Sequence, residues 1–278
     1  MNKKTNKHGL SRDIGEDIKR QIRQECGFGC VCCGFAIASY EHIDPEFKNA
    51  KTHDPQKIAY LCEACHSRVT RKFWSKSKVK QARKSPWCIV NGKCHDAFEI
   101  STMTPEIWLG PNRVSNVPII LAVDDEVLLM IEPPECQNGP FRLSGRFYDK
   151  HGKLLFSISR NEWCGNPNNW DIECVGGKII VRRAKRKIAL QIRTIPPRGI
   201  MVEKAHMIHK GAEIYIDLYT LRVTSNNRST LSMQGRIVEG TGKYGVLLQA
   251  NTQNGTVIMG PGSYIVRSFD FIGVIKNR

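Results

Sequence analysis

Long apolar runs are missing from this sequence. No stretch approaches the roughly 18 apolar residues that a helix needs to cross a bilayer, which argues against a membrane-spanning helix. The first ten residues, MNKKTNKHGL, are basic, and no apolar segment follows them, so no secretory signal is expected there. We therefore expect a cytoplasmic chain with no membrane partner and with a flexible basic arm at its start.

Acidic residues are also scarce. The 278 residues include 26 Asp and Glu against 42 Lys and Arg, for a formal net charge of +16. A surplus of this size favours a polyanionic partner, and nucleic acid is the class we expect. The shortage is greatest in residues 68–84, which carry eight basic residues and no acid.

A convincing amphipathic helix is absent from residues 115–278. Short apolar runs and alternations, such as KIALQIR, recur there between Gly, Pro, Asn and Asp. This pattern predicts an all-β region, and it leaves a sandwich, a barrel and a stacked solenoid open. Residues 1–95 are rich in Lys, Cys and His and form the expected N-terminal domain, with 96–114 as a connector.

One helix is predicted near the start of the chain. Isoleucines recur every four positions in SRDIGEDIKRQIRQEC, at Ile14, Ile18 and Ile22. Ser11 is expected to cap this helix, and Arg20 and Arg23 are expected to face solvent.

Cysteine is abundant, with 11 residues, of which six lie between positions 26 and 65. Clustered cysteines in a reducing compartment bind metal more often than they form disulfides. Two C-x-x-C pairs with 28 residues between them suit a tetrahedral structural zinc site. Its expected ligands are Cys30, Cys33, Cys62 and Cys65. A redox dithiol is the alternative.

The other cysteines do not fit this pattern. Cys26, at the end of the predicted helix, is expected to be packed. Cys32 lies inside the first pair and would be a ligand only in an altered register. The remaining five are expected to be buried or free thiols: Cys88, Cys94, Cys136, Cys164 and Cys174.

Residues 20–72 resemble an HNH endonuclease domain. The matching stretches are RQECGFGCVCCG, YEHIDP and HDPQKIAYLCEACH, in the order found in that family. The resemblance covers about a fifth of the chain. It implies an α+β fold class, in which a small zinc-braced ββα-metal (HNH) domain precedes the all-β region.

The resemblance also implies site residues. His42 matches the general base, and Glu41 and His66 match the ligands of a catalytic divalent metal, Mg²⁺, Mn²⁺ or Zn²⁺. Such an ion stabilises the charge that develops on phosphate, and a neutral His takes a proton from water. Alternatively, His42 is a structural histidine, Glu41 a solvated strand residue, and His66 a zinc ligand.

One position departs from the family. Lys57 stands where the family has an Asn that bonds the loop backbone and orients the base. Lys cannot accept a hydrogen bond, so either the loop is held in another way or activity is reduced or absent. His53 is the nearest polar substitute, as an orienting residue or an extra metal ligand, and its alternative role is to cap the loop.

The basic run would hold the substrate. Arg68, Arg71 and Lys72 follow His66 closely and are expected to contact DNA phosphates, with little dependence on sequence. Phe73 and Trp74 are expected to pack in the core rather than to stack on bases.

Three functions remain open from the sequence. The first is a metal-dependent endonuclease acting on double-stranded DNA, with a β region that targets or regulates it. Through this region the chain would form a homodimer or bind a protein partner. The second is a zinc-dependent nucleic-acid-binding protein whose catalysis has lapsed. The third is a structural or interaction protein in which the β region has the main role.

Overall fold

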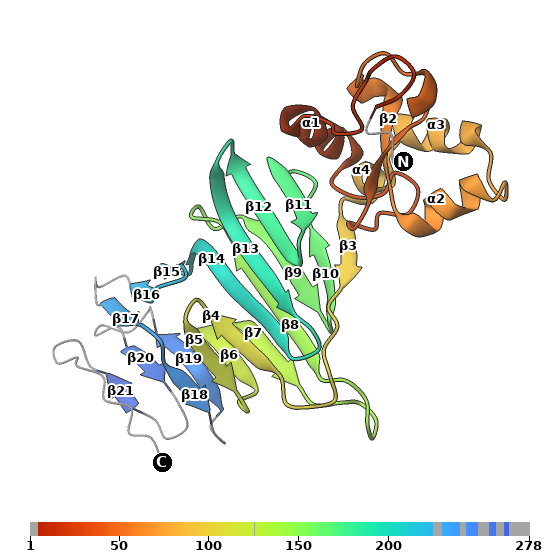
Figure 1. Cartoon of the computed structure of the whole chain (residues 1–278). Helices are drawn as coiled ribbons and strands as arrows, with labels where there is room; N and C mark the ends of the chain where they lie inside the picture. The colour runs from red at the N-terminus through yellow and green to blue at the C-terminus, as the bar shows by residue number, and fades with distance from the viewer. Residues whose placement is uncertain are drawn as a thin grey trace. The chain divides into compact units, whose positions relative to one another are not determined.

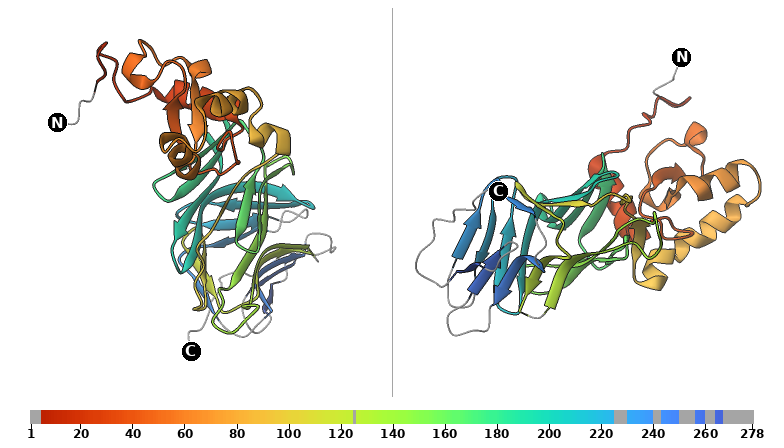
Figure 2. Two further views of the ribbon diagram at one scale, coloured as in Figure 1. Left: turned by 90° about the vertical axis from the view of Figure 1, so that its right-hand side faces the viewer. Right: turned by 90° about the horizontal axis from the view of Figure 1, so that it is seen from below.

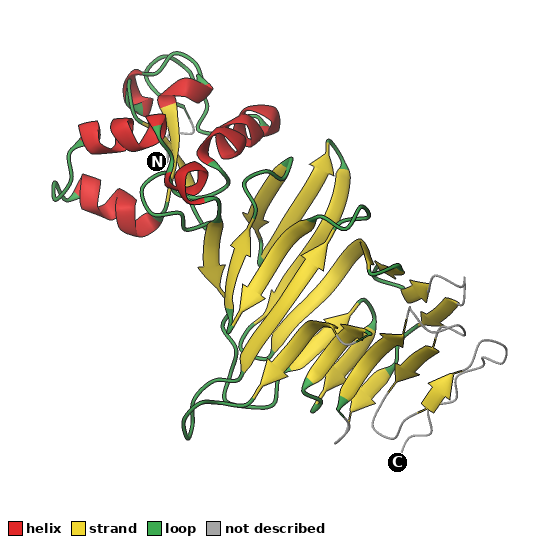
Figure 3. Ribbon diagram, turned by 180° about the vertical axis from the view of Figure 1, so that it is seen from behind, coloured by secondary structure: helices red, strands yellow, loops and turns green. Residues whose placement is uncertain are grey.

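The computed structural model describes residues 5–124, 126–224, 230–239, 243–249, 256–259 and 264–266. The structure is mostly β, with 43% strand and 17% helix. Its helices lie in the N-terminal part of the chain, and strands make up the rest (Figure 3). The expected α+β fold class with a small ββα-metal domain is wrong, because strand periodicity governs most of the sequence and the helices are few and short. In the described ranges no helix is both long enough and apolar enough to span a membrane.

The chain divides into two compact units. The first contains residues 1–96, 164–176 and 180–187, and the second contains 97–163, 177–179 and 188–278. The first unit therefore includes two segments from the region expected to be separate. Residues 96–114, expected as a connector, contain the strands β4 (Glu106–Leu109) and β5 (Asn112–Ser115).

Short elements build the N-terminal part of the first unit, which is one compact group in both views of Figure 2. Helices α1 and α3 both contact strand β2 (Figure 1). In chain order the elements are α1 (Glu16–Cys26), β1 (Ser39–His42), the 3-10 helices η1 (Phe47–Asn49) and η2 (Pro55–Lys57), β2 (Ile58–Leu61), α2 (Glu63–Thr70), α3 (Lys76–Lys84) and α4 (Trp87–Asn91).

Helix α1 is shorter than its isoleucine pattern suggested. It starts at Glu16 with Gly15 at the N-cap, so Ser11 does not cap it. The Ser11 hydroxyl instead accepts a bond from the Asp13 N–H at 3.0 Å, which forms a turn. The helix ends at Cys26, and the positive φ of 70° at its C-cap, Gly27, suits a residue without a Cβ.

Strands β1 and β2 form an antiparallel pair in which Glu41 lies opposite Ala59 and His42 opposite Ile58. All four residues of β2 are buried, so this strand fixes β1 against the core. Helix α2 begins directly after β2, with Cys62 at its N-cap. The buried strand β2 therefore holds Glu41 and His42 on β1 close to the start of helix α2.

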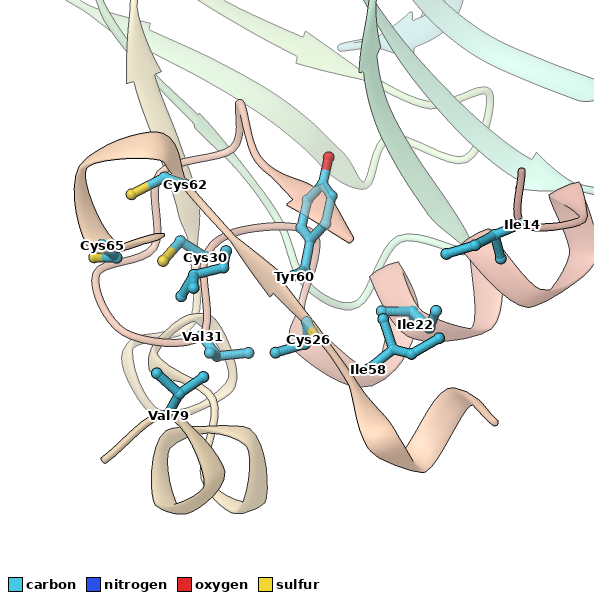
Figure 4. Packing of buried hydrophobic residues seen from close by; sticks show 12 residues of the cluster. Ile14, Ile22, Cys26, Cys30, Val31, Ile58, Tyr60, Cys62, Cys65 and Val79 are labelled. Carbon is cyan, nitrogen blue, oxygen red and sulfur yellow. The ribbon is translucent and has the colours of Figure 1, made fainter. Parts of the chain in front are cut away.

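The core of the first unit is shown in Figure 4. Its buried members are Ile14, Ile22, Cys26, Cys30, Val31, Ile58, Ala59, Tyr60, Leu61, Cys62, Cys65 and Val79. Four of these are cysteines, and a core this small gains stability from a metal or another cross-link.

An ion pair cluster ties α1 to a distant segment of the same unit. Arg23 Nε and Nη2 donate to the two carboxylate oxygens of Asp171, each at 2.9 Å. Arg182 Nη1 donates to Asp171 at 2.8 Å, and Arg23 Nη1 donates to the Tyr40 hydroxyl at 2.6 Å. Arg23 is only 2% exposed, so its expected position on the solvent face is wrong. The guanidinium tolerates burial because these partners satisfy it.

The remaining strands are, besides β4 and β5, the following: β3 (Cys94–Ala97), β6 (Ile119–Val123), β7 (Glu126–Glu132), β8 (Arg142–Tyr148), β9 (Leu154–Ser159), β10 (Glu162–Gly165), β11 (Asp171–Val175), β12 (Lys178–Ala184), β13 (Lys187–Ile195), β14 (Gly199–His209), β15 (Ala212–Ile216), β16 (Leu221–Thr224), β17 (Thr230–Met233), β18 (Ile237–Glu239), β19 (Tyr244–Gln249), β20 (Thr256–Met259) and β21 (Tyr264–Val266).

Antiparallel ladders organise the described part of the second unit. Strands β6 to β9 pair in sequence order, and so do β14 to β17. Three parallel pairings add to them: β4 with β14, β5 with β18, and β6 with β19. The parallel pairings join strands far apart in sequence, which is why the run of strands alone did not determine the architecture.

Candidate metal centre and adjoining pocket

Four cysteines of the first unit form a cluster. The Sγ atoms of Cys30, Cys33, Cys62 and Cys65 all lie within 4.8 Å of one another, close enough to bind one metal ion. Figure 4 shows the sulfurs of Cys30, Cys62 and Cys65 turned toward a common space. The two pairs meet because one precedes β1 and the other starts α2, where the antiparallel strands bring them together.

The chemistry of the cluster favours a cation. Hydrogen bonds from the Cys32 and Cys33 thiols lower the pKa of Cys30. Burial, followed by the charge of Cys30, raises the pKa of Cys65 to about 12. The charge of an ionised Cys30 thus opposes the ionisation of Cys65, and a bound divalent ion would remove that conflict by stabilising the thiolates.

The other cysteines are not part of this cluster. Cys26 is fully buried, as expected, and burial raises its pKa to about 11. Cys32 is partly buried and is absent from the set of four, although it lies between two of the ligands in sequence. The five further cysteines are free thiols, and Cys88 and Cys94 are buried.

Glu41 and His66 meet next to the cysteine cluster. Glu41 lies on β1 and His66 on the first turns of α2, and Glu41 Oε2 is 3.4 Å from His66 Nε2. Their side chains are about half exposed, at 46% and 48%. Glu41 Oε2 and His66 Nε2 therefore belong to side chains that are open to solvent.

His42 lies beside this pair in a more buried position. It is 8% exposed, and burial, followed by the neighbouring His53, lowers the pKa of its imidazole. His53 Nδ1 is 3.2 Å from His42 Nε2. His42 is thus a neutral imidazole near pH 7, in contact with a second ring that can orient it.

Lys57 does not take over the contacts of an Asn side chain. Its ammonium lies 3.5 Å from Asp54 Oδ2, on the solvent side. The main chain holds the loop instead, since the Ile43 N–H donates to the Lys57 carbonyl oxygen at 2.9 Å. The polar group that contacts His42 is therefore His53 rather than the residue at position 57.

A pocket of about 580 Å³ opens at these residues. Glu41, His42 and His66 all contribute to its wall, and so does Lys72. The full lining comprises Arg12, Glu41, His42, Ile43, Glu46, Phe47, Lys48, Leu61, His66, Val69, Thr70, Lys72, Lys76 and Val79. Four cations thus face two carboxylates, and Glu46 forms ion pairs with both Lys48 and Lys76.

Some cations of the basic run 68–84 are held by contacts within the protein, and others are exposed without an ion pair among the described residues. Lys80 pairs with Asp44, and Arg83 pairs with Glu25 and donates to the Ile58 carbonyl oxygen. Arg68 lies over the Trp74 ring, 4.9 Å from its centroid, and does not line the pocket. Arg71 and Lys72 are exposed, and neither has an ion pair within the described part of the chain. The three predicted phosphate contacts are therefore not equivalent.

The start of the chain also contributes to the pocket. Residues from Thr5 onward are not a free arm: the Asn6 side-chain amide donates to the carbonyl oxygens of Phe47 and Ala50, at 2.6 and 2.7 Å. This places the Arg12 guanidinium over the Phe47 ring, 4.9 Å from its centroid. Sequence reasoning missed Arg12, because nothing in its local pattern indicates the loop against which it docks.

The expectation for the two aromatic residues of the basic run is half right. Trp74 packs against the core of the first unit. Phe73 is 79% exposed and does not pack there.

The chain matches no protein-family model, no curated protein and no solved structure. The likeness to the HNH endonucleases rests on the motif residues alone.

Proposed function

We propose that this chain is a metal-dependent endonuclease of the HNH type that hydrolyses phosphodiester bonds of double-stranded DNA. The observation that carries the proposal is the approach of Glu41 Oε2 to His66 Nε2, at 3.4 Å, in the pocket that also contains the buried His42. The strand-rich second unit is proposed to target or regulate this activity.

The four cysteines would hold a structural Zn²⁺. Zinc–sulfur bonds of about 2.3 Å in a tetrahedron place sulfur atoms about 3.8 Å apart. Cys33 Sγ lies 3.6 Å from both Cys62 Sγ and Cys65 Sγ, which is close to that spacing and far too long for a disulfide. These two separations support the proposal that the cluster holds zinc.

A second divalent ion, Mg²⁺, Mn²⁺ or Zn²⁺, would bind Glu41 and His66. Two ligands of one ion, with bonds of about 2.1 Å, lie about 3.0–3.4 Å apart, so the observed separation fits. When bound, such an ion stabilises the negative charge that develops on the phosphate and on the departing oxygen. A carboxylate and an imidazole suit these ions because both ligands are hard or borderline.

His42 would accept the proton of the attacking water. Its neutral imidazole is available near pH 7, and its burial limits the orientations of the ring. If His42 Nε2–H donates to His53 Nδ1, the Nδ1 atom of His42 stays free to take the proton. His53 acts in this scheme as a positioning residue.

Cations around the pocket would hold the DNA backbone. Arg12, Lys48, Lys72 and Lys76 line it, and phosphate contacts of this kind give affinity that falls steeply with salt. Arg12 and Lys72 have no ion pair among the described residues. Their side chains can therefore turn toward a phosphate without breaking an ion pair. The paired Lys48 and Lys76 would have to leave Glu46.

Nicking of supercoiled plasmid tests the proposal. The full-length protein should convert supercoiled DNA to nicked or linear DNA with Mg²⁺ or Mn²⁺ and should not do so without added divalent metal. His42→Ala should lose this activity. His151→Ala, at an exposed turn of the second unit, is the matched control and should retain it. Cleavage by His42→Ala equal to that of the parent protein would overturn the mechanism.

A second candidate is a zinc-dependent nucleic-acid-binding protein without cleavage. The observation in its favour is the Lys57 side chain, which lies with Asp54 and leaves the orienting role to His53. Salt-sensitive DNA binding with no nicking in any of the three metals would support this candidate over the endonuclease.

A further inference from the structure

Phe73 is the most exposed aromatic residue of the basic run. Its exposed fraction is 79%, whereas the adjacent Trp74 packs against the core. The exposed ring offers no polar atom to solvent and leaves an aromatic face free for contact with a flat partner. Two neighbouring aromatics thus have opposite environments, and the turn between α2 and α3 determines which one is exposed.

The turn holds Phe73 outward from both sides. Before it, Lys72 has a positive φ of 66° and donates its N–H to the Val69 carbonyl oxygen at 3.0 Å. After it, the Trp74 N–H donates to the Arg68 carbonyl oxygen at 3.0 Å. The cations of Arg68 and Lys78 flank the Trp74 ring, 4.9 and 3.8 Å from its centroid. Trp74 is therefore an anchor, and Phe73 cannot exchange places with it without breaking these contacts.

The surroundings of Phe73 are cationic. Lys72 immediately precedes it, Lys76 lies three residues later, and both line the pocket of Glu41 and His66. Arg71 is also exposed. A flat apolar ring next to the cations that line the pocket matches the chemistry of nucleotides, which combine a charged backbone with aromatic bases. An apolar protein partner or a lipid tail would not need the surrounding charge.

We propose that Phe73 is a base-stacking residue, which inserts against an unstacked base of DNA whose backbone is held by Lys72 and Lys76. This inference rests on the proposed function and deepens it by assigning the substrate class. That class is DNA with a base that leaves the stack at low cost, such as a base in a mismatch, in a bulge or opposite an abasic site. Selectivity of the pocket then comes from helix distortion rather than from the order of bases.

The test compares DNA affinities of the full-length protein in buffer without added Mg²⁺ or Mn²⁺. Three 20-base-pair probes are used: a fully paired duplex, the same duplex with one mismatch, and the same duplex with one abasic site. The parent should bind the two distorted probes more tightly than the paired one. Phe73→Ala should weaken binding to the distorted probes by about 5- to 150-fold and remove the preference. The slope of log affinity against log salt should not change, because the side chain carries no charge.

The matched control is Tyr219→Ala, since Tyr219 is also an aromatic residue with 79% exposure and lies in the second unit. It should bind all three probes as the parent does. Compared with Phe73→Ala, Phe73→Tyr should restore more of the affinity for the distorted probes than Phe73→Leu does, because stacking needs an aromatic face. Equal affinities of Phe73→Ala and the parent for the distorted probes would overturn the inference.

The proposed function is judged separately, by plasmid nicking in Mg²⁺ or Mn²⁺. A parent protein that nicks DNA while Phe73→Ala shows no binding defect refutes base stacking alone. A parent protein that never nicks DNA, yet prefers the distorted probes through Phe73, refutes the endonuclease and retains base stacking. A parent protein that binds none of the probes refutes both.

Discussion

His53 Nδ1 lies 3.2 Å from His42 Nε2, and this contact joins the loop after β1 to the buried imidazole of the pocket. Two rings at this distance share one proton, since two N–H groups cannot point at each other. The contact therefore links the tautomer of His42 to that of His53, and the His42 ring also lies against Phe47, whose centroid is 5.4 Å away. An Asn side chain is expected to orient the base in HNH endonucleases, and in the function proposed for this chain His53 would take that role from another position in the sequence.

The cysteine cluster gives a prediction about metal content. The purified protein should contain one zinc ion per chain, and Cys62→Ser should lose it, because one of four thiolates is removed. Cys32→Ser is the matched control: it changes a cysteine within the same turn but outside the set of four, and it should keep the metal. Elemental analysis by mass spectrometry measures both variants. Full zinc occupancy in Cys62→Ser would contradict the assignment.

The Arg23–Asp171 pair gives a prediction about stability. Asp171→Asn should lower the free energy of unfolding of the first unit by about 3–5 kcal/mol, because it leaves the buried Arg23 and the nearby Arg182 with one fewer charge to balance them. Arg183→Ala, at an exposed position of the same segment, should change it by less than about 0.5 kcal/mol. Urea denaturation followed by circular dichroism measures both. Equal midpoints for Asp171→Asn and Arg183→Ala would show that the pair is not important for stability.

The parts of the site that could be predicted from sequence are those fixed by local spacing. A C-x-x-C turn brings its two sulfurs together whatever the rest of the chain does, so the four cysteines were identifiable. Glu41 and His42 could be found in the same way, since their motif lies on one strand.

The parts that could not be predicted depend on distant partners. Arg23 looked like a solvent-facing residue of an amphipathic helix, and its partner Asp171 is 148 residues further along the chain. Arg12 reaches the pocket only because Asn6 bonds the loop at Phe47. The predicted fold class was wrong for a related reason. The helical pattern before residue 95 is visible in the local sequence, whereas the parallel pairing of β4 with β14 joins distant strands and has no local signature.

The basic turn gives a prediction about DNA binding. Replacing Arg71 and Lys72 together with Ala should weaken binding about equally for different sequences of paired duplex. It should also reduce the slope of log affinity against log salt by about 0.9 for each lost phosphate contact. Lys150→Ala with Lys153→Ala, in a turn of the second unit, is the control and should leave the slope unchanged. Arg68→Ala should have a smaller effect on the slope, because Arg68 lies over Trp74. A loss of affinity for one sequence only would mean that these residues contact base edges.

The Glu41–His66 pair gives a prediction about the catalytic ion. Glu41→Ala and His66→Ala should each abolish nicking at low Mn²⁺ or Mg²⁺, and a higher metal concentration should restore part of it, because each variant retains one ligand. Both variants should keep their zinc, since neither residue belongs to the cysteine cluster. Nicking rates over a titration of Mn²⁺ separate the parent from the variants by the metal concentration at half-maximal rate. If His66→Ala lost zinc instead, His66 would belong to the structural site.

The final prediction separates His42 from His53. His42→Ala should lower the nicking rate by a factor of about 10²–10⁴, the usual effect of removing a general base, and no concentration of Mn²⁺ should restore it. DNA affinity measured without added divalent metal should stay within about twofold of the parent, because His42 carries no charge to lose.

His53→Ala should reduce kcat by a smaller factor, of up to about 10²-fold, through misorientation of His42, with little change in KM. His53→Asn should recover part of that loss, since an amide can still accept or donate the bond to His42 Nε2. Should His53→Asn be as slow as His53→Ala while both keep normal metal dependence, the orienting role fails. A shift of the half-maximal Mn²⁺ concentration in both variants would instead make His53 a third ligand of the ion.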